Sequence, residues 1–249
     1  MSVKFYQLFL ALFFWAGVAS AQRVVPAWAG GADQNAFSFG YTFQYVNSSY
    51  KILKKPDWRT PYFDQGINRN VTDSLNSISS PVTGGFALGF LARYTVTENL
   101  EIRTVPTLSF TDRVINYQYR TQDLAPDKQQ IVSTTQAEFP LELKLKSNRI
   151  GNFRAYVLGG VKYAYGIGNQ SKGNEADLAP LERKLKNVRN FSSYVAGFGC
   201  DIYLEYFKLS PEIKLSNSFG NMLYPENHPY ANPLDKLYLH NIMFSLFFE

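Results

Sequence analysis

Large apolar residues alternate strictly with small or polar residues along the first part of the mature chain. Between Ala36 and Val46 every second position is aromatic, and serine, glycine, threonine and glutamine lie between. The aromatic residues are Phe37, Phe39, Tyr41, Phe43 and Tyr45. A period of two places them on one face of a β-strand and fits no helix. Taken alone, the segment would also suit a half-buried strand of a soluble sheet.

The same alternation recurs in seven further segments of the chain. Each is long enough to cross a bilayer as a tilted strand, which needs about ten residues. The eight expected strands cover residues 36–46, 83–94, 100–110, 131–146, 154–165, 194–206, 207–219 and 239–249.

Short and long connections follow one another between these strands. Short turns are expected near residues 95–99, 147–153 and 205–208, and long polar stretches at 47–82, 111–130, 166–190 and 220–237. This alternation is typical of outer-membrane barrels. The sequence therefore predicts an all-β fold: an eight-stranded antiparallel outer-membrane β-barrel with short periplasmic turns, four long extracellular loops and both termini in the periplasm.

A soluble eight-stranded barrel of the lipocalin kind is the competing architecture. It would hold its apolar residues inside and its charges outside. Here the charges share a face with glycine and serine, which suits the crowded interior of a small barrel, and the other face suits lipid.

Three prolines strain the strand assignment. Pro106, Pro140 and Pro211 lie inside expected strands, where a residue without an N–H is normally confined to edges or bulges. We expect Pro106 and Pro211 to mark bulges near the periplasmic rim. If they end their strands instead, the strand count is wrong there.

The N-terminus has the three regions of a secretory signal peptide. Lys4 provides a positive start, residues 5–18 are apolar, and Ala19-Ser20-Ala21 offers a cleavage site. A membrane-anchoring helix is the weaker alternative, because the apolar stretch is short and Gln7 interrupts it. We expect residues 1–21 to be a cleaved signal peptide, 22–35 a periplasmic segment, and 36–249 the barrel.

Composition narrows the chemistry. The chain is 16% aromatic and 18% charged, with a single cysteine and two histidines. One cysteine excludes an internal disulfide framework, and so few histidine and cysteine residues leave little for a transition-metal site. Catalysis would need a histidine close to a carboxylate and a nucleophile, and the sequence spacing does not bring His228 or His240 to residues such as Asp235 and Ser245. We therefore expect that the protein is not an enzyme. We also expect no cofactor, no metal, no small-molecule substrate and no nucleic-acid partner.

Ten charged residues fall on inward positions by parity, and five acidic side chains oppose five basic ones. Because an unpaired buried charge is costly, this balance predicts a mutually paired network in the lumen. A selective pore is the alternative, but an eight-stranded barrel is only just wide enough for side chains to fill it. The ten residues are Glu101, Glu142, Asp201, Glu205, Glu212, Arg103, Lys144, Arg154, Lys162 and Lys214.

The long loops are rich in aromatic and basic residues, a composition that resembles protein-contact surfaces. Residues 178–189 of the third loop are also compatible with a short helix. The alternative is that the loops only cover the barrel mouth. Ten residues are candidates for partner contact: Tyr50, Trp58, Arg59, Tyr62, Phe63, Arg183, Lys186, Arg189, Tyr224 and Tyr230.

Several segments resemble one family of outer-membrane barrels. Residues 77–90 (SISSPVTGGFALGF), 100–110 (LEIRTVPTLSF), 206–216 (YFKLSPEIKLS) and the closing LFFE are similar to PorT proteins of the Bacteroidota, called SprT in gliding bacteria. The stretch Lys55-Pro-Asp-Trp-Arg59 is also PorT-like. The resemblance covers nearly the whole mature chain and carries over no catalytic or ligand residue.

This resemblance implies a component of the type IX secretion system, which serves protein export and gliding motility. A lumen this narrow cannot pass a folded protein, so an accessory or assembly role is expected, with other secretion proteins, including the large translocon barrel, as partners. The alternatives are a stand-alone structural or adhesive surface barrel and a narrow small-solute channel.

Overall fold

The computed structural model describes residue 33, residues 35–167 and residues 178–249. The expected signal peptide and nearly all of the expected periplasmic segment lie outside this part of the chain. Within it there is no helix long and apolar enough to cross a membrane.

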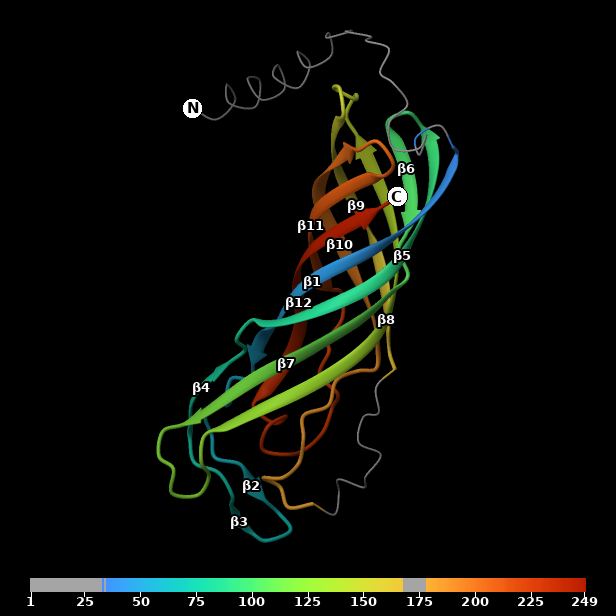
Figure 1. Cartoon of the computed structure of the whole chain (residues 1–249). Coiled ribbons are helices and arrows are strands. Elements are labelled where there is room, and N and C mark those ends of the chain that lie inside the picture. Colours follow the sequence, from blue (N-terminus) through green and yellow to red (C-terminus); the bar gives the residue numbers. More distant parts are fainter. Residues whose placement is uncertain (1–32, 34, 168–177) are drawn as a thin grey trace, which may run out of the picture.

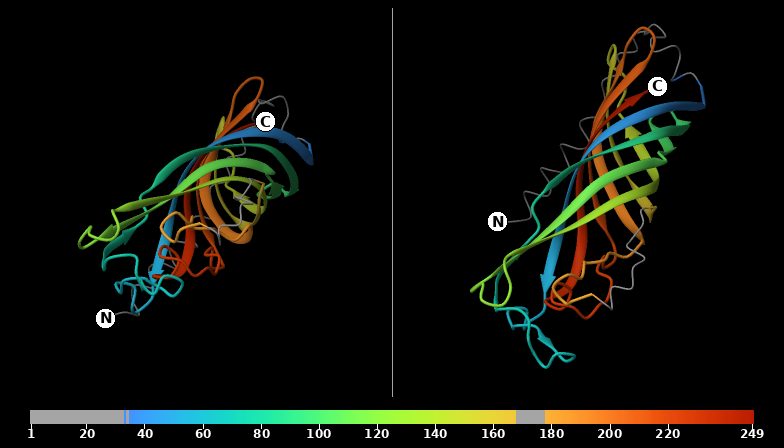
Figure 2. Two further views of the ribbon diagram at one scale, coloured as in Figure 1. Left: turned by 90° about the horizontal axis from the view of Figure 1, so that it is seen from below. Right: turned by 60° about the horizontal axis from the view of Figure 1, so that its bottom comes forward.

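The strands close into an antiparallel ring, because β1 pairs with β12 on one side and with β5 on the other. Figure 2 shows the curved wall of this ring in two further orientations. The prediction of an eight-stranded antiparallel barrel is confirmed. Its wall consists of β1 (Phe37–Lys54), β5 (Thr83–Thr97), β6 (Leu100–Thr104) continued by β7 (Thr107–Tyr119), β8 (Lys128–Lys146), β9 (Phe153–Gly166), β10 (Asn190–Tyr203), β11 (Lys208–Ser218) and β12 (Leu234–Phe248).

The pairing register shows how strongly the strands are staggered. Register partners can be followed from strand to strand once around the ring, starting at Ser49 of β1. The path returns to β1 at Phe39, ten positions earlier in the chain. Such a stagger tilts the strands against the barrel axis, as Figure 1 shows. The path runs Ser49, His240, Asn217, Tyr194, Val161, Leu141, Thr104, Ala92, Phe39.

The three prolines interrupt hydrogen bonds without shifting the register. Pro106 separates β6 from β7, yet both segments continue one register with β5 and with β8. Pro211 remains paired with Leu246, and Pro140 with Lys162. The expected bulges at Pro106 and Pro211 are therefore wrong: each proline omits a donor while the backbone stays in line.

The strands continue well into the connections that the sequence pattern assigned to loops. β1 runs to Lys54, and the second connection shrinks to residues 120–127. The first connection carries the short strands β2 (Phe63–Asp64), β3 (Arg69–Asn70) and β4 (Leu75–Ser79), and β4 pairs with the far end of β7. The described residues 178–189 of the third connection contain no helix, which contradicts the expected one.

The two faces of the wall differ sharply. The outer face carries a belt of large apolar residues, including Phe39 of β1, Phe90 of β5 and Leu141 of β8, which are 73%, 75% and 58% exposed. Inward positions hold charged, hydroxyl and glycine residues. Because the belt spans about nine residues of several strands, it matches the apolar thickness of a bilayer.

The short turns and the C-terminus lie at one end of the barrel, and β2, β3 and the longer loops lie at the other (Figure 1). The first end is called the turn end below, and the second the loop end. The β7–β8 hairpin, with β4 at its edge, projects far beyond the rest of the wall at the loop end (Figures 1 and 2).

Candidate functional site: the lumen and its loop end

The structure places the inward charges of the sequence prediction together, with one exception. Glu205 is exposed, because β10 ends at Tyr203 and Glu205 belongs to the turn that follows. Its prediction as an inward residue is wrong, because side chains alternate between the two faces only within a strand, and β10 has ended before Glu205. The other nine are buried: Glu101, Glu142, Asp201, Glu212, Arg103, Lys144, Arg154, Lys162 and Lys214.

A group of ion pairs crosses the middle of the lumen. The Nε atom of Arg103 lies 2.7 Å from Oε2 of Glu142, and its Nη2 lies 2.6 Å from Oε2 of Glu212. The Nζ of Lys214 lies 3.2 Å from the other Glu212 oxygen and 3.4 Å from Glu142. The hydroxyl of Tyr156 donates to Glu212 at 2.9 Å. Every charge in this group therefore has an opposite partner, as burial demands.

Two further ion pairs lie on the inner wall. The Nζ of Lys144 lies 2.8 Å from Asp201, which also accepts a hydrogen bond from the hydroxyl of Ser210. The Nζ of Lys162 lies 2.8 Å from Glu138. Lys144 and Asp201 belong to β8 and β10, which are separated by β9, so this pair also connects strands that are not neighbours.

The turn end holds a cluster of which the sequence prediction included only Glu101. Arg93 binds the side chains of Glu101 and the terminal residue Glu249, and Lys208 lies 3.0 Å from Glu249. Asp33 contacts Lys208 and accepts a hydrogen bond from Tyr203. Asp33, on the N-terminal side of β1, and Glu249, directly after β12, thus contact the same two cations, Arg93 and Lys208.

Asp33 keeps its charge in this cluster. Burial raises the pKa of its carboxyl, but Lys208 and the Tyr203 hydroxyl outweigh this effect, so the pKa lies below its ordinary value. Asp33 lies outside the expected strands, so parity did not mark it. Glu249 ends the expected strand 239–249 and shares the inward parity of Asn241 and Ser245, but it was not counted. Arg93, Glu138 and Lys146 do follow the inward parity of their strands, and a full count by parity would have found them.

The lumen is not balanced five against five. In the described residues nine cations and five acidic residues are buried in the strands. The carboxylates of Asp33 and Glu249 add two negative charges at the turn end. The nine cations are Arg93, Arg103, Arg113, Lys144, Lys146, Arg154, Lys162, Lys208 and Lys214.

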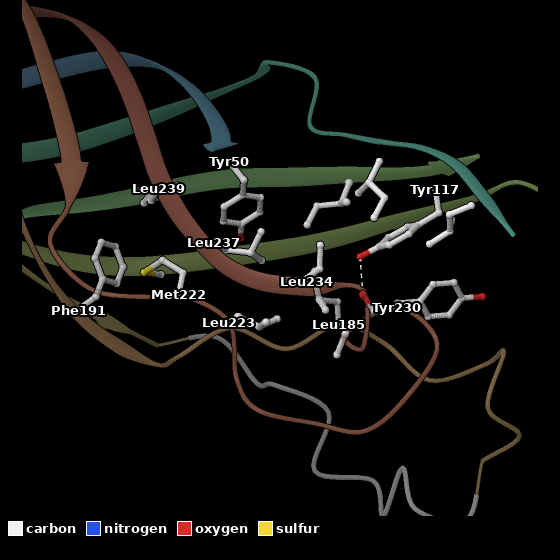
Figure 3. Close-up of a cluster of buried hydrophobic side chains, with 14 of the residues drawn as sticks. Tyr50, Tyr117, Leu185, Phe191, Met222, Leu223, Tyr230, Leu234, Leu237 and Leu239 are labelled. Carbon is white, nitrogen blue, oxygen red and sulfur yellow. Dashed lines mark hydrogen bonds between the residues drawn. The ribbon is translucent and has the colours of Figure 1, made fainter. Parts of the chain in front are cut away.

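Beyond the charges, the loop end contains a buried apolar cluster (Figure 3). Side chains of β1, β7, β12 and the last two connections meet there, and the Tyr117 hydroxyl donates to the backbone oxygen of Tyr230 at 2.7 Å. Met222 and Leu223 come from the connection between β11 and β12, so this connection folds into the barrel mouth. The labelled members are Tyr50, Tyr117, Leu185, Phe191, Met222, Leu223, Tyr230, Leu234, Leu237 and Leu239.

Two candidate contact residues belong to this cluster instead of the surface. Tyr50 is 5% exposed and accepts a hydrogen bond from the Asn187 amide, and Tyr230 is 2% exposed. Neither is accessible to a partner, so these two predictions are wrong. The aromatic composition of loops did not distinguish residues that fold inward from residues that remain outside.

The remaining candidates lie at or near the surface of the loop end. Arg59, Phe63, Arg189 and Tyr224 are exposed, and Trp58, Tyr62, Arg183 and Lys186 are partly exposed. The Trp58 ring packs on the apolar cluster and is flanked by Lys54 and Arg59, whose charged groups lie 4.1 and 4.9 Å from its centre.

A small hairpin extends from this position. The strands β2 and β3 pair Phe63 with Asn70, and the backbone of Val71 donates to Tyr62 at 3.0 Å, which closes the hairpin base. Phe63 and Ile67 are both 50% exposed. Exposed apolar residues beside basic ones, held on a closed hairpin, form a compact surface that we call the loop-one tip (residues 58–70).

A groove of about 670 Å³ marks the outer wall where the apolar belt ends toward the loop end. His240 lines it and contacts the Asn217 side chain. Ser245 is fully buried in the lumen, on the opposite face of β12 from His240. The histidine and this hydroxyl therefore cannot meet. In the described part of the chain no group of three acidic, histidine or cysteine residues is placed to hold a metal ion.

Comparison with known proteins agrees with this architecture. A family model described as an outer membrane protein beta-barrel domain matches residues 30–224. A search of curated proteins finds no match.

Solved structures of outer membrane proteins are also similar at low sequence identity. Pseudomonas aeruginosa OprG is 15% identical, with 85% of this chain and 93% of that chain covered and a TM-score of 0.48. Escherichia coli outer membrane protein W is 18% identical, with 84% and 97% covered and a TM-score of 0.33. Yersinia pestis Ail is 14% identical, with 86% and 99% covered and a TM-score of 0.35.

Proposed function

Because the chain belongs to the family of outer membrane protein β-barrel domains, and is thus a protein of the bacterial outer membrane, we propose that it is a closed barrel with an accessory or assembly role in type IX protein secretion. Its periplasmic termini and turn end would leave the loop end at the cell surface. The PorT-like segments of the sequence support the assignment to this secretion system.

The single observation that carries the accessory role is the contrast between a filled lumen and an exposed loop end. Arg103, Glu142, Glu212 and Lys214 occupy the lumen with mutual ion pairs, and the apolar cluster fills the mouth. Such an interior favours a scaffold over a conduit for cargo. Among the exposed surfaces of the loop end, the loop-one tip is the one that combines several aromatic and basic residues.

The loop-one tip has the composition of an interface centre. Aromatic and arginine side chains dominate the binding energy of many interfaces. The loop-one tip contains Trp58, Arg59 and Phe63. Lys54, Lys55, Arg59 and Arg69 outnumber Asp57 and Asp64 in this region, which favours an acidic partner surface.

The sharpest test removes the hairpin without disturbing the barrel. Deleting the whole first connection would also remove Leu75 and Ile78 from the apolar cluster. Residues 63–70 can instead be replaced by a two-residue Asn-Gly turn, because the Tyr62–Val71 contact already brings the ends together. Ile150→Ser is the matched control: it removes a 79% exposed apolar side chain at the turn end.

We expect a tagged wild-type chain to co-purify in mild detergent with other secretion proteins, and the hairpin replacement to lose these partners and cargo secretion while still inserting. Ile150→Ser should retain both. Normal secretion by the hairpin replacement would refute docking through the β2–β3 hairpin of the loop-one tip. A pull-down that contains only this chain would refute the secretion role and favour a stand-alone structural or adhesive barrel.

A further inference from the structure

Arg113 differs from every other cation buried in the described wall. The other eight each form an ion pair with a carboxylate, whereas no ion pair of the described residues includes Arg113. Its side chain belongs to β7 and is 1% exposed. Burying a charge without a counter-charge is among the costliest arrangements in a protein.

Hydrogen bonds compensate this charge only in part. The Nη2 of Arg113 donates to Oε1 of Gln136 at 2.8 Å. Its Nε and Nη1 are buried and have no hydrogen-bond partner among the described residues. A guanidinium has five N–H donors, so most of its binding capacity faces the interior of the lumen unused.

Other unpartnered polar groups belong to the same layer of the barrel. The Thr83 hydroxyl contacts the backbone oxygens of both Ser48 and Asp112, which brings β1 and β7 together beside the start of β5. Ser48 is the register partner of Asn241 on β12. The Ser48 hydroxyl and the Asn241 amide oxygen are both buried and have no hydrogen-bond partner in the part of the chain that the structure describes.

The layer is covered on the loop side. Two positions further along β7, Ile115 is fully buried and belongs to the apolar cluster, as does Leu239 on β12, two positions before Asn241. On the other side, Thr111 and Ser109 continue the polar inner face of β7. The unused donors therefore lie in the lumen beneath the apolar cluster.

We propose that this layer binds a small monovalent inorganic anion of the chloride class, held by Nε and Nη1 of Arg113. The Ser48 hydroxyl donates to the same anion. The Asn241 side chain also donates to the anion if its amide is flipped, so that its nitrogen occupies the position of the oxygen. A single cation matches a single negative charge, whereas a dianion would bring an uncompensated charge into a buried site.

The bound anion is structural, because it completes the pairing of the lumen charges. It does not depend on the proposed secretion role. The bound anion is not an ion in transit through the barrel, because the apolar cluster closes the lumen between this layer and the loop end.

Crystals of the full-length barrel grown in sodium bromide test the site directly. We expect a bromine anomalous peak in contact with the Arg113 guanidinium in the wild type and no peak in Arg113→Gln. Lys162→Gln is the matched control, because Lys162 is an inward cation that already has Glu138 as its partner; this variant should keep the peak. An ordered water in place of bromide at Arg113 would overturn the proposal.

A melting experiment in detergent gives an independent readout. At equal ionic strength, sodium chloride should raise the Tm of the wild type by roughly 5 °C relative to sodium gluconate, whose anion is too large for the layer. Lys162→Gln should show the same difference, and Arg113→Gln should show none. If Arg113→Gln does not fold, Arg113→Lys replaces it, with a smaller difference expected. Equal wild-type Tm values in the two salts would contradict the proposal.

Discussion

Arg103 and Glu212 form an ion pair between directly opposite walls of the barrel. Three strands separate β6 from β11 in either direction around the ring, yet Nη2 of Arg103 lies 2.6 Å from Oε2 of Glu212. The two residues are 109 positions apart in the sequence. This contact spans the lumen, so the same pair that stabilises the wall also occupies the interior.

Removing one partner of this pair should destabilise the barrel strongly. Arg103→Met leaves Glu212 and Glu142 buried with less compensation, and Glu212→Leu leaves Arg103 with one carboxylate. We expect each to lower the free energy of unfolding by about 3 kcal/mol. Urea unfolding of the barrel refolded into lipid vesicles measures this.

The double variant Arg103→Met/Glu212→Leu distinguishes coupling from general damage. It removes both charges, so its loss should be smaller than the sum of the single losses by at least about 1 kcal/mol. Strict additivity would show that the two side chains do not interact energetically.

Inward glycines make room for large lumen side chains, and Gly199 is the clearest case. A Cβ atom at Gly199 would lie 2.6 Å from the Tyr156 hydroxyl and 2.6 Å from the Pro211 oxygen. We expect Gly199→Ala to cost about 2 kcal/mol by overpacking. At Gly159 the nearest atom is 3.9 Å away. Gly159→Ala should therefore change the unfolding free energy by less than about 0.5 kcal/mol, and equal effects at the two positions would contradict the packing argument.

A pair of residues on one strand tests where the membrane lies. Leu141 and Ile131 both lie on the outer side of β8 and are 58% and 53% exposed, but Leu141 lies within the apolar belt and Ile131 beyond it. We expect Leu141→Arg to lower the unfolding free energy in vesicles by about 2–4 kcal/mol. Ile131→Arg should have an effect below about 1 kcal/mol. Similar losses would place both residues in lipid.

Asp73 connects the first long connection to the second, and this contact should depend on pH. Its carboxylate accepts hydrogen bonds from the backbone of Leu124 at 2.9 Å and Ala125 at 3.4 Å. The Leu124 N–H is the largest of the effects that lower the pKa of Asp73 below its ordinary value. Because the folded-state pKa is lowered, the contact stabilises the loops above the ordinary Asp pKa of about 3.9 and is lost as pH falls through the lower value.

Hydrogen exchange of the Leu124 amide measures this dependence. Its protection, relative to the intrinsic rate at each pH, should fall on acidification below about pH 4. Asp73→Asn has a side chain that does not ionise, so its protection should be lower at neutral pH and independent of pH. Constant protection in the wild type would contradict the assigned hydrogen bonds.

The strand pattern could be predicted from the sequence because one physical rule governs every strand core. Lipid selects large apolar residues on one face, and the narrow lumen selects glycine, hydroxyl and charged residues on the other. The positions of Phe37–Tyr45, Leu141 and Arg103 all follow from this alternation. The rule has no meaning beyond the end of a strand, which is why Glu205 was placed inside and Asp33 was missed.

The loop end could not be predicted in the same way. Tyr50 and Tyr230 carry the same side chain as the exposed Tyr224, and only the folding of the last connection into the mouth buries them. Likewise, nothing in the sequence around Pro106 shows that β6 and β7 form one continuous strand that keeps its register with both β5 and β8. These features depend on contacts between segments far apart in the chain, such as Tyr117 with Tyr230.

Conductance in planar bilayers shows whether the barrel is filled and so acts by contact rather than as a pore. The purified wild-type barrel should insert without producing stepwise current. The variant Arg103→Ala/Glu212→Ala/Tyr117→Phe removes the Arg103–Glu212 ion pair and the hydrogen bond from the Tyr117 hydroxyl to the Tyr230 backbone oxygen. It serves as a control that shows whether the recording detects a weakened interior. Reproducible conductance steps from the wild type, with an ion selectivity altered by Glu212→Leu, would contradict the account and favour a small-solute channel.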